Sequence, residues 1–288
     1  MNARFTDYLS SLRTRNCSPL TIAEYERDLN TFARFLPGAD VLSVDRATIA
    51  DYVSWLRDNG LSATTTQRRL AVVHSFYRFL VETGALSTNP ADGVQRPKRK
   101  QRLPVYFTEG ESRALLESVD GLNRERDYAI LLLALVSGLR VSEIVSLNVS
   151  DIQRSGDVCF FRVTGKGGKE RQVFLSPNCV EALDQYLAVR ERYGADTDAL
   201  FLSRKHQRIS VDAVQGLVKK HSRKAGLPPV SPHKLRHTAA TLMLDNGVDI
   251  RTIAEVLGHS SVSTTQIYTH VQKERLRNAC AANPASGF

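Results

Sequence analysis

Cysteine is scarce in this sequence, and its few copies are far apart. The four cysteines, Cys17, Cys159, Cys179 and Cys280, form no C-x-x-C pair. A zinc ribbon needs such pairs and a small disulfide scaffold needs a denser set, so the pattern argues against both classes. We therefore expect reduced cysteines, buried as small apolar side chains, in a cytoplasmic protein.

Long apolar segments are lacking as well. The first residues, M-N-A-R-F-T-D-Y, contain no apolar core of the kind found in signal peptides. The longest apolar run, residues 129–136, is much shorter than the roughly 18 residues that a transmembrane helix needs. The sequence thus predicts no membrane partner.

The chain is long enough for two domains, and it is basic. Its 288 residues include 42% hydrophobic and 24% charged residues, which is sufficient for well-formed cores. The formal net charge of +9 favours an acidic partner, most often nucleic acid, because neutralised phosphates release condensed counterions. Charge alone leaves open a basic enzyme that acts on something else.

Residues 1–97 predict a helical N-terminal domain. Ser18 and Pro19 provide an N-cap and a first-turn proline for a helix that ends near residue 36. Apolar residues at helical spacing predict two more helices, over 48–57 and from about 62 to Gly84.

Polar residues fill the first turns of the last of these helices. Their hydroxyl, amide and guanidinium groups suit contacts with phosphates and base edges. These candidate DNA-binding residues are Thr64, Thr65, Gln67, Arg68 and Arg69. On pattern alone, a solvated polar face is the simpler explanation.

Residues 98–103 are predicted to link two domains. The run 96–102 contains five basic residues and no acid, and nearby prolines argue against a continuing helix. The run is either a solvated tether or a cationic strap along a DNA backbone, and the strap explains both its charge and its place. Lys98, Arg99 and Lys100 therefore join the candidate DNA-binding residues.

Residues 104–288 predict a second domain that is mainly helical. Residues 158–163 and 171–175 alternate as strands do, around a glycine-rich turn at 164–169, so we expect one β-hairpin. The fold class is therefore mainly α, with a small β-hairpin in the second domain. Caps and apolar spacing place the main helices near 108–119, 126–137, 177–192, 210–224, 232–245, 250–257 and 263–278.

The second domain contains the residue types that phosphoryl transfer needs. His233 and Arg236 are three residues apart on a predicted helix, so their side chains share a face. His237 could form a metal pair with His233, but Lys234 stands where an H-E-x-x-H motif has its glutamate. The sequence also contains no P-loop and no two-metal carboxylate cluster, so we expect no metal and no cofactor.

Four more residues have ordinary structural explanations when each is taken alone. Arg140 starts a helix, Lys166 lies in the glycine-rich turn, His259 follows a helix end, and Tyr268 lies in an early helical turn. Together with His233 and Arg236, they supply cations that bind a phosphate, an imidazole that moves a proton and a phenol that attacks phosphorus. One site for phosphoryl transfer explains all six residues together.

The phrases around these residues resemble the catalytic motifs of tyrosine recombinases. They are A-L-V-S-G-L-R-V-S-E-I (134–144), T-G-K-G-G-K-E-R-Q-V (164–173), H-K-L-R-H-T-A-A-T (233–241) and L-G-H-S-S-V-S-T-T-Q-I-Y-T-H-V (257–271). The likeness is greatest to the bacterial Xer recombinases and extends over nearly the whole chain, including S-P-L-T-I-A-E-Y-E-R-D-L near its start.

The resemblance implies a phosphate clamp. Arg140 and Arg236 would hold the non-bridging oxygens of the scissile phosphate, a task that suits forked guanidinium groups. Glu143, on the same helix face as Arg140, would orient it, and His259 would donate a further hydrogen bond to the phosphate.

The resemblance also implies how the protons move. Tyr268 would attack phosphorus and form a 3′-phosphotyrosyl bond, and His233 would accept the tyrosine proton. Lys166 would protonate the leaving 5′-oxygen. The adduct conserves the energy of the phosphodiester bond, so rejoining needs no nucleotide.

The resemblance further implies a C-shaped, two-domain clamp around duplex DNA and a tetramer of one or two related recombinases. The segment 271–282 would dock on a neighbouring protomer, although packing within its own domain explains its pattern nearly as well. The implied role is resolution of chromosome or plasmid dimers, with a DNA translocase as a candidate activator. The alternatives are a mobile-element integrase, a type IB topoisomerase and a DNA-binding regulator without catalysis.

Overall fold

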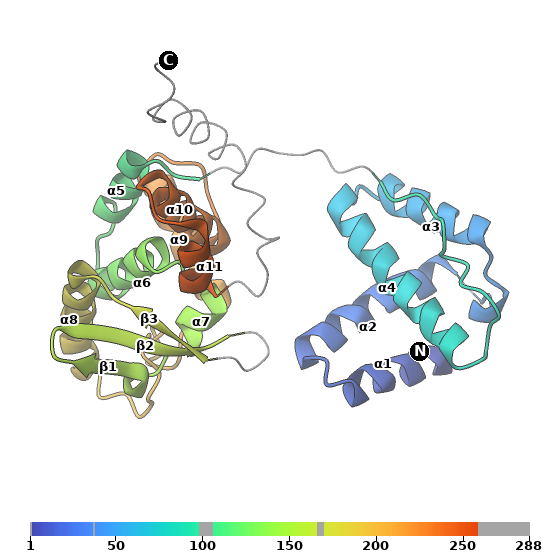
Figure 1. Ribbon diagram of the computed structural model, residues 1–288, viewed down its shortest axis with the longest axis horizontal. Helices are drawn as coiled ribbons and strands as arrows, with labels where there is room; N and C mark the ends of the chain where they lie inside the picture. Colours follow the sequence, from blue (N-terminus) through green and yellow to red (C-terminus); the bar gives the residue numbers. More distant parts are fainter. Residues whose placement is uncertain (1, 37, 98–105, 166–169, 259–288) are drawn as a thin grey trace, which may run out of the picture. The chain divides into compact units, whose positions relative to one another are not determined.

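Buried apolar side chains form separate cores before and after the basic run. The computed structural model describes residues 2–36, 38–97, 106–165 and 170–258. In these residues one large core precedes the run, and a large core and a smaller one follow it. The chain accordingly divides into two compact units, Met1–Arg102 and Leu103–Phe288. Figure 1 shows the helices and strands of each unit.

Capping side chains set the helix starts of the N-terminal unit. Its helices are α1 (Ala3–Thr14), α2 (Pro19–Phe35), α3 (Arg46–Asp58) and α4 (Ala63–Glu82), with a short 3-10 turn η1 (Val41–Ser43) before α3. The side chains of Asn2, Ser18, Asp45 and Ser62 each accept a hydrogen bond from a first-turn backbone N–H of the following helix. The helix starts predicted at Ser18 and Ser62 are confirmed.

Aromatic side chains fill the core of this unit around α4, which contacts α1, α2 and α3. Phe76 of α4 packs edge-on against Phe5, with the ring centroids 4.8 Å apart. Phe32 and Tyr52 pack in the same way at 4.9 Å, and all four rings are fully buried. This core turns one face of α4 inward and leaves Arg68, in its first turns, exposed.

The predicted end of the last helix at Gly84 is confirmed, but the rest of the predicted helical domain, residues 85–97, contains no helix. After α4, Gly84 adopts a left-handed conformation and residues 85–97 form turns and irregular segments. Asn89 organises them, since its side chain accepts from the Ala91 N–H at 2.9 Å and donates to the His74 carbonyl at 3.1 Å. Pro90 and Pro97 lack the N–H groups that a helix would use.

One buried helix, α6 (Arg124–Val136), is the centre of the second unit. It contacts each of α5, α7, α8, α9 and α10, and every residue from Ala129 to Leu135 is buried. The longest apolar run of the sequence is therefore a core helix. The other helices of the described residues are α5 (Glu109–Glu117), α7 (Val141–Ser146), α8 (Pro177–Glu191), α9 (Val211–Lys224), α10 (Pro232–Asp245) and α11 (Ile250–Leu257), with a 3-10 turn η2 (Val149–Asp151).

A small antiparallel sheet interrupts the helices, in agreement with the predicted mainly α fold that contains one β-hairpin. Its strands β1 (Ile152–Ser155), β2 (Val158–Thr164) and β3 (Glu170–Phe174) pair in chain order. The predicted hairpin is β2 and β3, in which Phe161 lies opposite Val173 and both side chains are buried. The prediction missed β1, because its half-exposed residues show no apolar alternation and only pairing with β2 makes it a strand.

The position of α6 leads to a stability prediction. Leu131→Ala empties part of the core, since Leu131 is fully buried, and should lower the free energy of unfolding by about 2–5 kcal/mol. Leu122→Ala is the matched control, because Leu122 is 95% exposed and its loss should change stability by no more than about 0.5 kcal/mol. Urea denaturation followed by circular dichroism measures both, and equal stabilities would contradict this account of the core.

Candidate active site

The junction between α6 and α7 brings the end of α11 close to the start of the site. Gly138 follows α6 with a φ of +60°, a conformation that side-chain-bearing residues rarely adopt. A Cβ atom at this position would overlap Cδ2 of Leu257, the last residue of α11. Glycine therefore permits the contact between these two chain segments, and Arg140 follows two residues later as the N-cap of α7.

Arg236 joins the same two segments from α10. It is only 4% exposed, and its guanidinium donates to the carbonyls of Gly138 and Leu257, both at 2.6 Å. Arg140 donates to the next carbonyl, that of Gly258, at 3.1 Å. The two predicted clamp arginines thus meet at the end of α11, in contact with consecutive carbonyls.

Glu143 orients Arg140, as the sequence suggested, but it also binds a residue that the sequence analysis did not single out. One carboxylate oxygen accepts from the Arg140 backbone N–H at 2.8 Å and the other from its guanidinium at 2.9 Å. Arg171 of β3 then forms a fork with both oxygens, at 2.9 and 3.0 Å. One carboxylate therefore couples α7 to the hairpin strand that follows Lys166 in the chain.

Arg171 also limits which residue types are possible at position 258. A Cβ atom there would come within 2.9 Å of the Arg171 guanidinium carbon, and the φ of Gly258 is +63°. A signal for Arg171 does exist in the sequence, because it stands two residues before the buried Val173 and so shares the inner face of β3. A charged residue on an inner strand face requires a partner.

Charge balance keeps Glu143 ionised. Its side chain is only 5% exposed, and this burial alone would raise the carboxyl pKa. The hydrogen bonds from Arg171 and from the Arg140 backbone outweigh that effect, so the pKa of Glu143 lies below its usual range. The carboxylate is therefore a permanent negative charge between two guanidinium groups.

His233 lies at the start of α10, on the same face as Arg236. Its ring meets that of His237 edge-on, with centroids 4.6 Å apart. Partial burial, and then the positive charges of Arg236 and Arg140, lower the pKa of His233 below its ordinary value. The imidazole is accordingly neutral at neutral pH, the form that can accept a proton.

Three of the predicted catalytic residues, Lys166, His259 and Tyr268, lie outside the described residues, as does the helix expected over 263–278. Lys166 follows Gly165, and His259 follows Gly258, directly in the chain. Among the described residues, no group of three or more His, Cys, Asp or Glu side chains could hold a metal ion. None of the helices described is long and apolar enough to cross a membrane.

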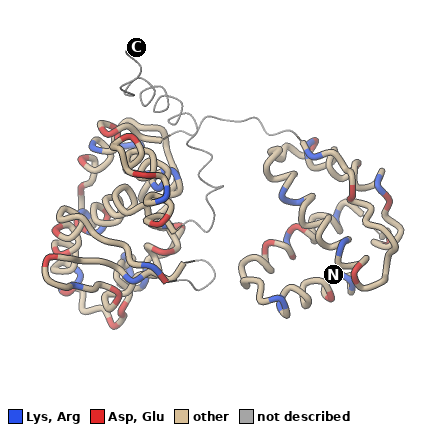
Figure 2. Tube along the Cα trace, viewed as in Figure 1, with Lys and Arg blue, Asp and Glu red and all other residues tan. Residues whose placement is uncertain are grey.

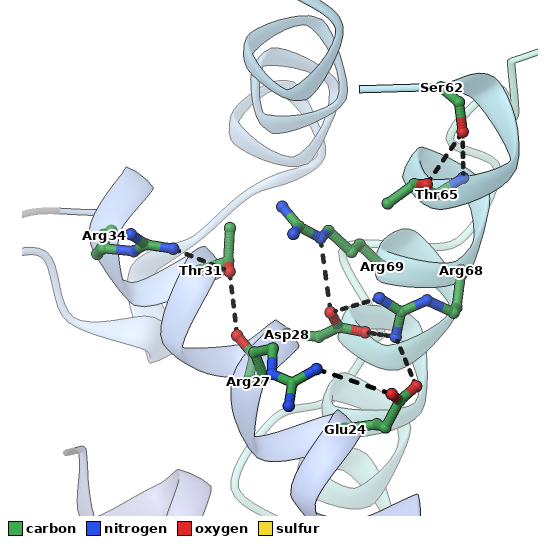
Figure 3. A network of polar contacts seen from close by, with 9 residues as sticks. All are labelled: Glu24, Arg27, Asp28, Thr31, Arg34, Ser62, Thr65, Arg68 and Arg69. Atoms are coloured by element: carbon green, nitrogen blue, oxygen red, sulfur yellow. Dashed lines mark hydrogen bonds and ion pairs between the residues drawn. The ribbon is translucent and has the colours of Figure 1, made fainter. Parts of the chain in front are cut away.

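The candidate DNA-binding residues of α4 differ in their surroundings. Thr64 is exposed, whereas the Thr65 hydroxyl contacts the capping Ser62 at 3.0 Å. The Gln67 side chain donates to the Pro97 carbonyl at 2.5 Å. Arg68 and Arg69 both contact Asp28 of α2, as Figure 3 shows. Lys98, Arg99 and Lys100 lie outside the described residues.

The net positive charge is distributed along the chain. Figure 2 shows Lys and Arg interspersed with Asp and Glu in both units. The local surroundings of each cation therefore matter more than the net charge, and at the end of α11 they include carbonyl groups and the Glu143 carboxylate.

Known proteins resemble this chain over most of its length. Residues 106–275 match the Phage integrase family, and residues 3–84 match the Phage integrase, N-terminal SAM-like domain. The chain is 43% identical to Tyrosine recombinase XerC of Caldanaerobacter subterraneus, covering 98% of this chain and 86% of the relative. It is 37% identical to Tyrosine recombinase XerC of Shigella flexneri serotype 5b, covering 98% and 95%.

The chain also resembles solved structures of proteins bound to DNA. The XerH site-specific recombinase bound to its palindromic difH substrate, in a post-cleavage complex, has a TM-score of 0.78 at 25% identity, covering 95% of this chain and 84% of that one. A lambda integrase dimer bound to a COC′ core site shares the fold, with a TM-score of 0.74 at 20% identity over 90% and 94% of the two chains. The chain therefore belongs to the phage integrase family and is a tyrosine recombinase, an enzyme that cuts and rejoins DNA at specific sites.

Proposed function

We propose that Arg140 and Arg236 clamp the scissile phosphate while Tyr268 attacks it. The observation that carries this proposal is that both guanidinium groups contact consecutive carbonyls at the end of α11, directly before His259 in the chain. Guanidinium groups bind phosphate oxygens through paired N–H donors, and His259 would add a further donor.

In the proposed reaction, the bond from the Tyr268 oxygen to phosphorus forms as the bond from phosphorus to the 5′-oxygen breaks. His233 accepts the phenol proton, and Lys166 gives a proton to the departing 5′-oxygen. The product is a 3′-phosphotyrosyl adduct and a free 5′-hydroxyl, which can attack the adduct to rejoin the strand. Cationic side chains supply the charge stabilisation that metal ions supply in many other phosphoryl transfers.

The proposed biological role is Xer-type resolution of chromosome or plasmid dimers in the cytoplasm. Its support is the likeness to two XerC proteins over nearly their full length. In this proposal residues 1–97 and 104–288 close around duplex DNA, with 98–103 as a linker. Four protomers, of this chain or of this chain and a related recombinase, hold two sites, and a DNA translocase activates exchange. A lambda integrase tetramer bound to a Holliday junction, which shares the fold, is consistent with such an assembly.

The nucleophile can be tested with a nicked duplex that traps the adduct and carries a site selected from random DNA. The unmodified chain should form a covalent protein–DNA adduct, visible on a denaturing gel, and Tyr268→Phe should form none. Tyr193→Phe is the matched control, since Tyr193 lies in the same unit and stacks on His206 at 4.6 Å, and it should form the adduct normally. An adduct that persists in Tyr268→Phe would assign the attack to another residue.

The neutral state of His233 leads to a pH prediction. Because its pKa is lowered, the imidazole stays unprotonated at pH values below the ordinary histidine pKa of about 6.5. Single-turnover cleavage should therefore stay constant from neutral pH down to that value and fall only at lower pH. His233→Gln should slow cleavage by about 10²–10⁴-fold and abolish this acid limb. A midpoint above 6.5, or an unchanged limb in the variant, would argue against His233 as the base.

Arg171 should matter for cleavage although it is not expected to touch the phosphate. Arg171→Gln removes the fork on Glu143 and should slow single-turnover cleavage by up to about 10²-fold through displacement of Arg140, with DNA affinity little changed. Arg154→Gln is the matched control, because Arg154 of β1 pairs with Asp184 on the surface, where both side chains are 48% exposed. Equal cleavage rates in the two folded variants would contradict the coupling.

A further inference from the structure

A buried carboxylate lies beneath the arginines of α4. Asp28, on α2, is fully buried, and both of its oxygens face the guanidinium of Arg68, one of them at 3.0 Å. The Nε atom of Arg69 lies 3.5 Å from the same carboxylate. Figure 3 shows the two arginines converging on Asp28 from the neighbouring helix.

Stability alone is a weak reason for such a pair. Desolvating a carboxylate is costly, and apolar side chains of similar volume often stabilise a core as well or better. Burial indeed raises the pKa of Asp28, against the lowering effect of Arg68. A buried carboxylate instead fixes the orientation of its partner, because two hydrogen bonds between two oxygens and two nitrogens hold the guanidinium in one plane.

Arg68 is fixed but still accessible. Its side chain is 45% exposed, whereas that of Arg69 is only 18% exposed. A guanidinium has five N–H donors and the fork uses only two, so Arg68 keeps donors beyond its contact with Asp28. Arg68 therefore presents oriented donors on the exposed face of α4.

A second carboxylate is placed where a ligand could replace it. Glu24, one turn before Asp28 on α2, approaches Arg68 at 3.6 Å and Arg27 at 3.8 Å, and its side chain is 44% exposed. These distances are too long for good hydrogen bonds. The outer carboxylate can leave Arg68 when another acceptor arrives, whereas the inner one, Asp28, cannot.

We propose that Asp28 is a positioning residue that holds Arg68 for a bidentate contact with the N7 and O6 acceptors of a guanine in the target site. The inference rests on the proposed site-specific binding of DNA by this unit. Asp28 already offsets the charge of Arg68, so the pair gains little from counterion release at phosphates and keeps directional donors. Directional donors distinguish base edges, which makes the pair a determinant of sequence preference.

The test compares the binding sites that each variant selects from random duplex DNA. Asp28→Asn keeps the shape of the side chain but cannot form the ionic fork, and it raises the net charge by one. Affinity for the site selected by the unmodified chain should fall by about 10–100-fold, and one guanine position should become degenerate. Affinity for random DNA should stay equal or rise, because the variant is more basic.

Control variants separate positioning from folding. Glu24→Gln should retain the guanine preference, since Glu24 is the replaceable partner, and Arg68→Lys should lose it. Adding Asp28→Asn to Arg68→Lys should cause no further loss of preference, because the carboxylate acts through Arg68. A merely structural Asp28 would instead weaken binding to both kinds of DNA by the same factor, in step with a lower melting temperature, and that outcome would overturn the inference.

Three further outcomes are decisive. If Asp28→Asn weakens binding to every sequence alike and reduces its salt dependence, Arg68 binds a phosphate and the guanine assignment is wrong. If the unmodified chain selects a site and Asp28→Asn selects the same one, only this inference fails. If the unmodified chain selects no site at all, the proposed function itself fails.

Discussion

The carboxylate of Glu143 is the interaction on which the rest of the catalytic geometry depends. Three guanidinium groups, from Arg140, Arg171 and Arg236, gather near the end of α11. Positive charges that lie close together in a partly buried site repel one another strongly. Glu143 accepts from two of them and carries the compensating charge. Because these partners come from α7 and β3, the same carboxylate fixes a helix relative to the sheet.

Much of the fold could be predicted from local sequence. Ser18 and Ser62 identified helix starts because a cap needs only a hydroxyl and the next few N–H groups. The hairpin of β2 and β3 was visible because its residues alternate between core and solvent. The irregular structure of residues 85–97 could not be predicted within the helical domain, since the hydrogen bonds that Asn89 makes with Ala91 and His74 depend on tertiary packing.

The site could be predicted only in part from local sequence. Helical spacing places His233 and Arg236 on one face, but no spacing rule connects either of them to Arg140. That connection depends on the contact between Gly138 and Leu257, which packing alone reveals. Resemblance to a family supplied the grouping, and it supplied neither Arg171 nor Asp28. Both were missed for one reason, because their partners, Glu143 and Arg68, lie on other elements of the fold.

The absence of a side chain at Gly138 has a consequence for how this site tolerates change. Any other residue would bring a Cβ atom onto Leu257 and would have to adopt a φ of +60°, so the end of α11 would have to move. The carbonyl of Leu257 would then shift away from Arg236, and that of Gly258 away from Arg140. A single added methyl group would therefore disturb both guanidinium groups at once.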